Sequence, residues 1–171
     1  MATATVQPIS GVTTGTEVEI MTVYPSIGST GLGQFLGSLY NSIPLGNFPV
    51  KLSHLLFTLP TAPLAVLAYF LLKLFGVRYT LTNRSVQIWK SLGNTLIRQI
   101  NLNDIGDISI TQTPGQVFYK CSDLHLEGKD GKPLMTLEGI PRAEVFRQNI
   151  LEARDAAVRV RASLAAIEAR H

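Results

Sequence analysis

One uncharged apolar run constrains the fold of this chain more than any other feature. It extends from Leu55 to Leu72 without a charged residue over eighteen positions, the length at which a membrane-spanning helix is predicted. At about 1.5 Å per residue it would cover roughly 27 Å, close to the hydrocarbon thickness of a bilayer. The alternative is a very apolar core helix, because Pro60 and Pro63 could divide the run. Membrane helices tolerate proline, so we predict a membrane helix over about residues 53–76.

Charged residues are distributed unevenly around this run. Residues 1–77 contain four of them, whereas residues 78–171 contain 23, of which thirteen are Lys or Arg. The positive-inside rule therefore predicts a protein of the inner (cytoplasmic) membrane with its C-terminal domain in the cytoplasm. The lone Cys121 agrees with a reducing compartment.

Two other segments belong to the uncharged N-terminal half. Residues 1–16 are polar and predict a disordered tail. Residues 31–46 carry no charge but are short and rich in Gly, Ser and Asn, so we expect an interfacial or re-entrant helix there. If this segment crosses the bilayer as well, the chain has two membrane helices and both termini are cytoplasmic.

After the apolar run, the sequence changes to short alternating segments separated by turn residues. This pattern, without helices in between, predicts an antiparallel sandwich or small barrel. The expected strands cover residues 77–81, 85–90, 95–102, 104–113, 117–121, 123–127 and 133–137.

The chain then ends in one long predicted helix, for which Pro141 suits the first turn. Its apolar positions are spaced alternately three and four apart from Ala143 to Ile167. We expect the first half, to about Ala153, to close the barrel. For the second half two interpretations stay open, a solvated extension or a self-association seam that yields a homo-oligomer. The seam residues would be Ala157, Val160, Leu164 and Ile167.

No catalytic motif is found in the sequence, so an enzyme is not expected, and neither a cofactor nor a bound metal is predicted. Asp123, His125 and Glu127 would share one face of a strand, which allows a metal or acid/base site. The solvated face of an amphipathic strand is the simpler interpretation.

Basic residues give the chain a net charge of +3 and a pI near 9.2. They alternate with acidic residues after the apolar run, so a nucleic-acid partner is not expected. A contact between a juxtamembrane basic group and the membrane surface fits better, although topological retention would explain the same charges. The candidate residues are Lys73, Arg78, Arg84 and Lys90.

Several segments together resemble the bacterial pleckstrin-homology-like (PH) domain family of small membrane proteins. The residues that carry the resemblance are Glu17 to Ser26 (EVEIMTVYPS), Arg78 to Val86 (RYTLTNRSV), Ile100 to Ile105 (INLNDI) and Leu137 to Glu144 (LEGIPRAE). The resemblance implies a seven-stranded, strongly bent barrel capped by a C-terminal helix. It covers residues 17–155, with the leading strand and membrane segment in 17–76 and the PH-like domain in 77–155. The distal helical extension in 156–171 lies outside the resemblance.

The resulting functional hypothesis is a non-catalytic, membrane-anchored interaction or scaffolding module at the cytoplasmic face. Its partners would be membrane lipids together with a protein or a second copy of the chain. The alternative is a lipid-binding or lipid-handling component that uses the basic juxtamembrane strands.

Overall fold

The computed structural model describes residues 17–40 and 59–168. The tail predicted over residues 1–16, the end of the segment 31–46 and the first residues of the helix predicted from residue 53 lie outside the described residues. No helix of the described chain combines the length and apolarity needed to cross a membrane.

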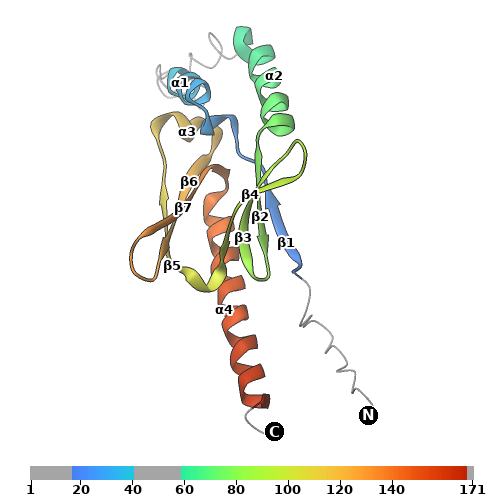
Figure 1. Cartoon of the computed structure of the whole chain (residues 1–171). Coiled ribbons are helices and arrows are strands. Elements are labelled where there is room, and N and C mark those ends of the chain that lie inside the picture. The colour runs from blue at the N-terminus through green and yellow to red at the C-terminus, as the bar shows by residue number, and fades with distance from the viewer. Residues whose placement is uncertain (1–16, 41–58, 169–171) are drawn as a thin grey trace.

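Seven strands form two antiparallel sheets (Figure 1). The first sheet has the order β1-β2-β3-β4, with strands Glu19–Val23, Val77–Thr82, Ser85–Lys90 and Thr95–Asn101. The second has the order β5-β6-β7, with strands Ile105–Thr111, Cys121–Gly128 and Pro133–Pro141. The predicted mainly β, seven-stranded architecture with a C-terminal helix is thereby confirmed.

Helices occupy the two ends of the molecule (Figure 1). The 3-10 turn η1 (Ile27–Ser29), α1 (Gly31–Tyr40) and α2 (Leu59–Phe75) lie in the connection between β1 and β2. Together with α3 (Pro114–Tyr119) they gather at one end. The 3-10 turn η3 (Leu102–Asp104) links the two sheets, and α4 (Ala143–Glu168) continues past the sheets at the opposite end.

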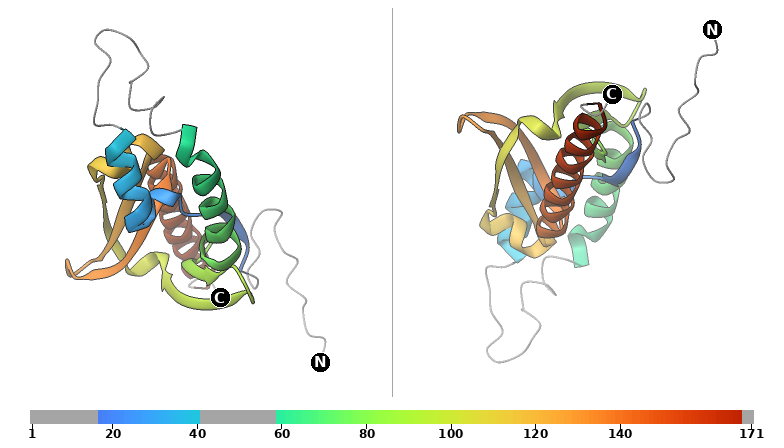
Figure 2. Two further views of the ribbon diagram at one scale, coloured as in Figure 1. Left: turned by 90° about the horizontal axis from the view of Figure 1, so that it is seen from above. Right: turned by 90° about the horizontal axis from the view of Figure 1, so that it is seen from below.

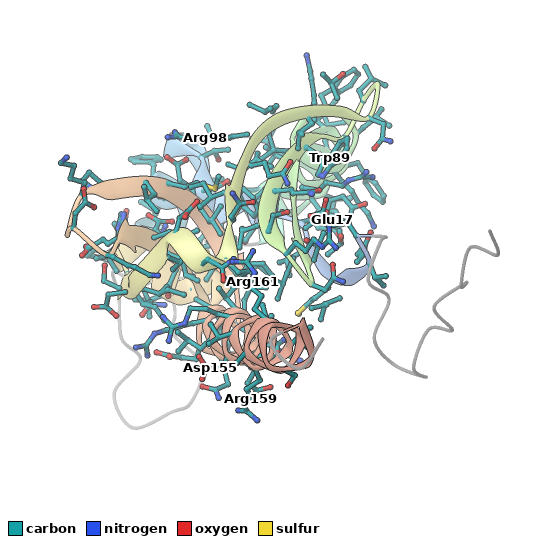
Figure 3. All side chains as sticks on the ribbon, turned by 60° about the horizontal axis from the view of Figure 1, so that its bottom comes forward. Glu17, Trp89, Arg98, Asp155, Arg159 and Arg161 are labelled. Atoms are coloured by element: carbon teal, nitrogen blue, oxygen red, sulfur yellow. The ribbon has the colours of Figure 1, made fainter. Side chains whose placement is uncertain are left out.

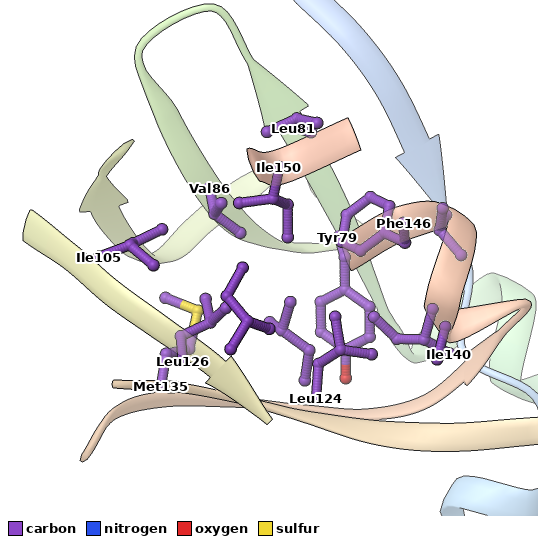
Figure 4. Packing of buried hydrophobic residues seen from close by; sticks show 14 of the residues in the cluster. Tyr79, Leu81, Val86, Ile105, Leu124, Leu126, Met135, Ile140, Phe146 and Ile150 are labelled. Atoms are coloured by element: carbon purple, nitrogen blue, oxygen red, sulfur yellow. The ribbon is translucent and has the colours of Figure 1, made fainter. Parts of the chain in front are cut away.

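One apolar core fills the space between the sheets (Figure 4). Alternate residues of each strand point into it, for example Leu124 and Leu126 of β6, as strand geometry requires. Figure 2 shows α4 running along the open side between the two sheets. Phe146 and Ile150 of α4 are fully buried there, which confirms that the first half of this helix closes the barrel. The core residues are Val23, Tyr79, Leu81, Val86, Leu102, Ile105, Ile108, Leu124, Leu126, Met135, Leu137, Ile140, Ala143, Phe146 and Ile150.

The strand predicted over residues 117–121 is wrong, because most of this segment belongs to α3. Pro114 occupies the first turn of that helix, where its missing N–H costs nothing. The Gln116 side chain accepts a hydrogen bond from the Thr113 backbone N–H at 3.0 Å, which satisfies the helix start. The hydrogen bond that caps the helix therefore outweighs the β propensity of the residues in this segment.

The predicted start of the C-terminal helix at Pro141 is also wrong. Pro141 is the last residue of β7, where it pairs with Cys121 of β6. Arg142 follows in the left-handed region, with a φ of 54°, and the helix begins at Ala143. The strand is longer than expected because β6 is longer too, and its register extends the pairing to this point.

Candidate functional site

α2 exposes a broad apolar surface and half-buries one narrower face. Phe70 is 62% exposed and Leu67, on the same side of the helix, is 56% exposed. The half-buried face is formed at helical spacing by Thr61, Ala65, Ala68 and Leu72. The other large apolar side chains that are exposed on this helix are Leu64, Val66, Tyr69, Leu71, Leu74 and Phe75. A helix that is apolar all round is usually buried in a large core or in a membrane. α2 contacts η1, and its Thr61 hydroxyl shares a hydrogen bond with Tyr40 of α1. The described chain leaves the rest of the apolar surface of α2 exposed, which is its most unusual feature.

A second apolar surface lies at the same end of the molecule, on α1 and α3 (Figure 1). Leu32 and Phe35 of α1 and Val117 of α3 are 53%, 64% and 49% exposed. Neither helix contains a charged residue. The predicted helix in residues 31–46 is thus confirmed over Gly31–Tyr40, where its other face packs on α3.

The fold brings three of the four predicted basic residues to one end of the first sheet. Lys73 is in the last turn of α2, Arg78 is the second residue of β2, and Lys90 is the last residue of β3. Lys90 pairs with Val77, next to Arg78. Arg84 lies in the turn between β2 and β3, at the other end of this hairpin. The fold therefore groups Lys73, Arg78 and Lys90 at one end of the sheet and places Arg84 at the other end.

A hollow of about 350 Å³ lies where the end of α2 meets the sheet. Its lining comes from three segments that are separate in the sequence: Tyr24, Phe70, Lys73, Leu74, Arg78, Ser91 and Leu92. The Ser91 backbone N–H donates to the Gly76 carbonyl at 2.9 Å, which holds the β3–β4 turn against the end of α2. Sequence reasoning missed Tyr24, Ser91 and Leu92, because only strand pairing brings them to the basic residues, Tyr24 through β1–β2 and the other two through β2–β3.

Arg78 is held by neighbours on both sides. Its guanidinium donates to the Asn94 side-chain carbonyl, and its Cζ lies 5.7 Å from the centroid of the Trp89 ring. Lys73 is held more loosely, with Nζ 5.6 Å from the ring centroid of Tyr24. Such cation–π contacts orient a cation without neutralising it. The hollow thus has two cations in its lining.

A polar cluster lies on the outer face of the first sheet (Figure 3). The Glu17 carboxylate accepts hydrogen bonds from Thr82 Oγ1 at 2.6 Å, from Gln87 Nε2 at 2.9 Å and from the Ser85 hydroxyl. Partial burial raises the pKa of Glu17, but these hydrogen bonds and the charge of Arg84 outweigh burial and lower the pKa below 4.5. The cluster ties the start of β1 to β2 and β3.

Asp123 and His125 of β6 form hydrogen bonds with different partners. His125 Nε2 lies 2.7 Å from Thr111 Oγ1, and His125 Nδ1 lies 3.1 Å from Thr136 Oγ1. Asp123 accepts hydrogen bonds at 2.7 Å from Gln116 Nε2 and from the Gly139 N–H, so it secures α3 and β7. The described residues contain no group of three or more His, Cys, Asp or Glu that could hold a metal ion.

Cys121 is a buried packing residue. Its Sγ would lie 2.6 Å from a Cβ added to Gly28, so the thiol fills the space that this glycine leaves. Burial raises the pKa of the Cys121 thiol, which disfavours the reactive thiolate.

The distal half of α4 presents its side chains to solvent. Asp155 and Arg159 lie on the side that faces away from the sheets (Figure 3). Ala157 is half-buried and Val160 is 36% exposed, whereas the side chains of Leu164 and Ile167 lie outside the described part. Ala157 and Val160 of the predicted seam thus lie on α4, and self-association through them stays a prediction.

Comparison with known proteins gives one match. The family model described as "Bacterial PH domain" matches residues 28–154, which include α1, α2, six of the strands and the first half of α4. No curated protein and no solved structure matches the chain.

Proposed function

The chain belongs to the bacterial PH domain family, and from this premise we propose that it is a non-catalytic interaction module held at the cytoplasmic face of a membrane by α2. In this proposal the two-sheet barrel is the module, and the distal half of α4 is the segment through which copies associate.

The observation that carries the proposal is the broad apolar surface that α2 exposes. Moving one large apolar side chain from water to an apolar phase contributes about 1.5–3 kcal/mol. The helix exposes eight such residues, and Lys73 in the last turn is its only charged residue. Because the barrel has a complete core without α2, a lipid phase is the proposed environment of this helix.

Two further features support a membrane at this end of the molecule. α1 lies at the same end of the molecule as α2 (Figure 1), so the same bilayer would cover its exposed Leu32 and Phe35. Lys73 and Arg78 lie at the border between α2 and the barrel, where basic side chains meet headgroups.

Vesicle flotation of the full chain after an alkaline carbonate wash tests the proposed attachment. The wild type is expected to float with phosphatidylcholine vesicles, whereas the double variant Leu67→Asp, Phe70→Asp should stay in the dense fraction. Each buried aspartate opposes insertion by about 3 kcal/mol. The matched control is Val158→Asp on α4, since Val158 is 54% exposed but lies outside the proposed membrane end. Carbonate release of the wild type would overturn the attachment.

The hollow at the end of α2 favours a second candidate function, lipid binding, because it joins basic and apolar side chains in one site. This function is compatible with the first, and its ligand is the subject of the next inference.

A further inference from the structure

We propose that the hollow between α2, β2 and the β3–β4 turn binds the phosphate group of an anionic lipid, with Arg78 and Lys73 as its ligands. The inference rests on the proposed membrane attachment, because that attachment would place the hollow at the level of the headgroups.

The charge of the lining is the first argument. Lys73 and Arg78 contribute two cations, and no carboxylate lines the hollow. The three salt bridges found within the described residues involve other side chains. Both cations border one concave site. An anion is therefore the complementary ligand.

Unsatisfied polar atoms are the second argument. Arg78 Nε and Ser91 Oγ are both buried, and neither has a hydrogen-bond partner among the residues described. A buried polar group without a partner costs about 1–3 kcal/mol, so such groups usually have a role. Asn94 and Trp89 already orient the guanidinium, which lowers the entropy lost when a phosphate binds.

The apolar part of the lining favours a lipid over a free phosphate ion. Phe70, Leu74 and Leu92 form this part, and all three are more than half exposed. From the hollow, the apolar surface continues along α2. A ligand with a phosphate group and acyl chains would satisfy both the cations and this surface, whereas inorganic phosphate would leave the apolar part in water.

The lone tryptophan of the chain, Trp89, is a reporter beside the site, because Arg78 stacks on its ring. We would titrate the full chain in neutral detergent micelles with dihexanoyl phosphatidic acid and follow Trp89 fluorescence. A saturable change is expected with this lipid and none with dihexanoyl phosphatidylcholine. Arg78→Gln and Lys73→Gln should each weaken binding about tenfold or more, as expected for loss of one charged hydrogen bond.

Lys90→Gln is the matched control, because it removes the same charge at the same end from a residue that does not line the hollow. Its affinity should stay within about twofold of the wild type. Equal weakening by Lys90→Gln and Lys73→Gln would overturn the site in favour of general surface charge. Since Lys73 is exposed, its variant tests the site even if Arg78→Gln fails to fold.

The remaining outcomes separate this inference from the proposed attachment. Inorganic phosphate that binds as tightly as phosphatidic acid would overturn the lipid assignment. Equal binding of phosphatidylcholine would overturn the phosphate recognition. A chain that floats with vesicles but gives no phosphate-dependent change would overturn the lipid site alone, whereas one that binds phosphatidic acid without floating would overturn the attachment alone.

Discussion

Glu17 stands just before β1, yet side chains of β2 and β3 hold its carboxylate. Its sequence neighbours give no sign of this, since an acidic residue at a strand end is commonly solvated. Thr82 and Ser85 come within reach only because β1 pairs with β2 across the whole α1–α2 insertion. At the residue scale, polar contacts thus depend on the strand register.

Replacement Glu17→Gln tests this contact through its pH dependence. The pKa of Glu17 is lowered in the folded state, so the carboxylate contributes stability above its unfolded pKa and loses it as pH falls through the folded value. Water screens this exposed group, so we expect a loss of less than about 1 kcal/mol at pH 7, which shrinks as pH falls from about 4.5 through the lower pKa of the folded state. Urea denaturation followed by Trp89 fluorescence measures it, with Glu19→Gln as control. A difference that stays constant down to pH 3 would refute the explanation.

At the scale of elements, α1 is positioned by backbone contact with α3. A Cβ added to Gly37 would lie 2.0 Å from the Gly115 carbonyl oxygen, and one added to Gly115 would lie 2.2 Å from the Gln34 carbonyl oxygen. The two helices therefore pack without intervening side chains. Leu32 and Phe35 of α1 stay exposed in this arrangement, and α1 lies at the same end of the molecule as α2.

Replacement Gly37→Ala should consequently separate α1 from α3. Overpacking of this kind costs about 1–3 kcal/mol, which a lower urea midpoint of the full chain in detergent would report. The control is Gly31→Ala in the same helix, where an added Cβ meets no atom within 4 Å. We expect it to be neutral or to stabilise by up to about 1 kcal/mol. Equal midpoints for both variants would contradict the proposed role of the close packing.

At the scale of the whole molecule, the two proposed contact regions lie at opposite ends. The apolar surfaces of α1 and α2 occupy one end, and the distal half of α4 extends from the other (Figure 1). The last fully buried core residue is Ile150, and none of the described side chains of residues 156–163 belongs to the core. A module attached at one end would therefore keep its association segment away from the bilayer.

Deletion of residues 156–171 should abolish the proposed self-association and change the unfolding free energy by less than about 1 kcal/mol. Light scattering of the full chain and the truncated chain in detergent measures the protein mass per micelle. Val160→Glu in the proposed seam should have the same effect, whereas Val158→Glu, which lies outside it, should not. An unchanged mass after truncation would show that α4 does not join two copies.

Much of this architecture could be predicted from local patterns. Alternation identified most strands, and the spacing from Ala143 onward identified α4. Local patterns gave a wrong prediction where helix capping or strand pairing opposes the local residue preference. At Pro114–Tyr119 a capped turn prevailed over strand-forming residues, and at Pro141 strand pairing prevailed over a residue that suits a helix start.

The sequence by itself determined the apolar run, the charge contrast between the two halves, and the family, because each depends on residue type and order. Only the tertiary structure decided which basic residues meet. Arg78 and Arg84 are six positions apart and share one hairpin, yet β-strand geometry sends them to opposite ends of it. Lys73, Arg78 and Ser91 form one hollow because strand pairing and the packing of a turn on α2 act over long range.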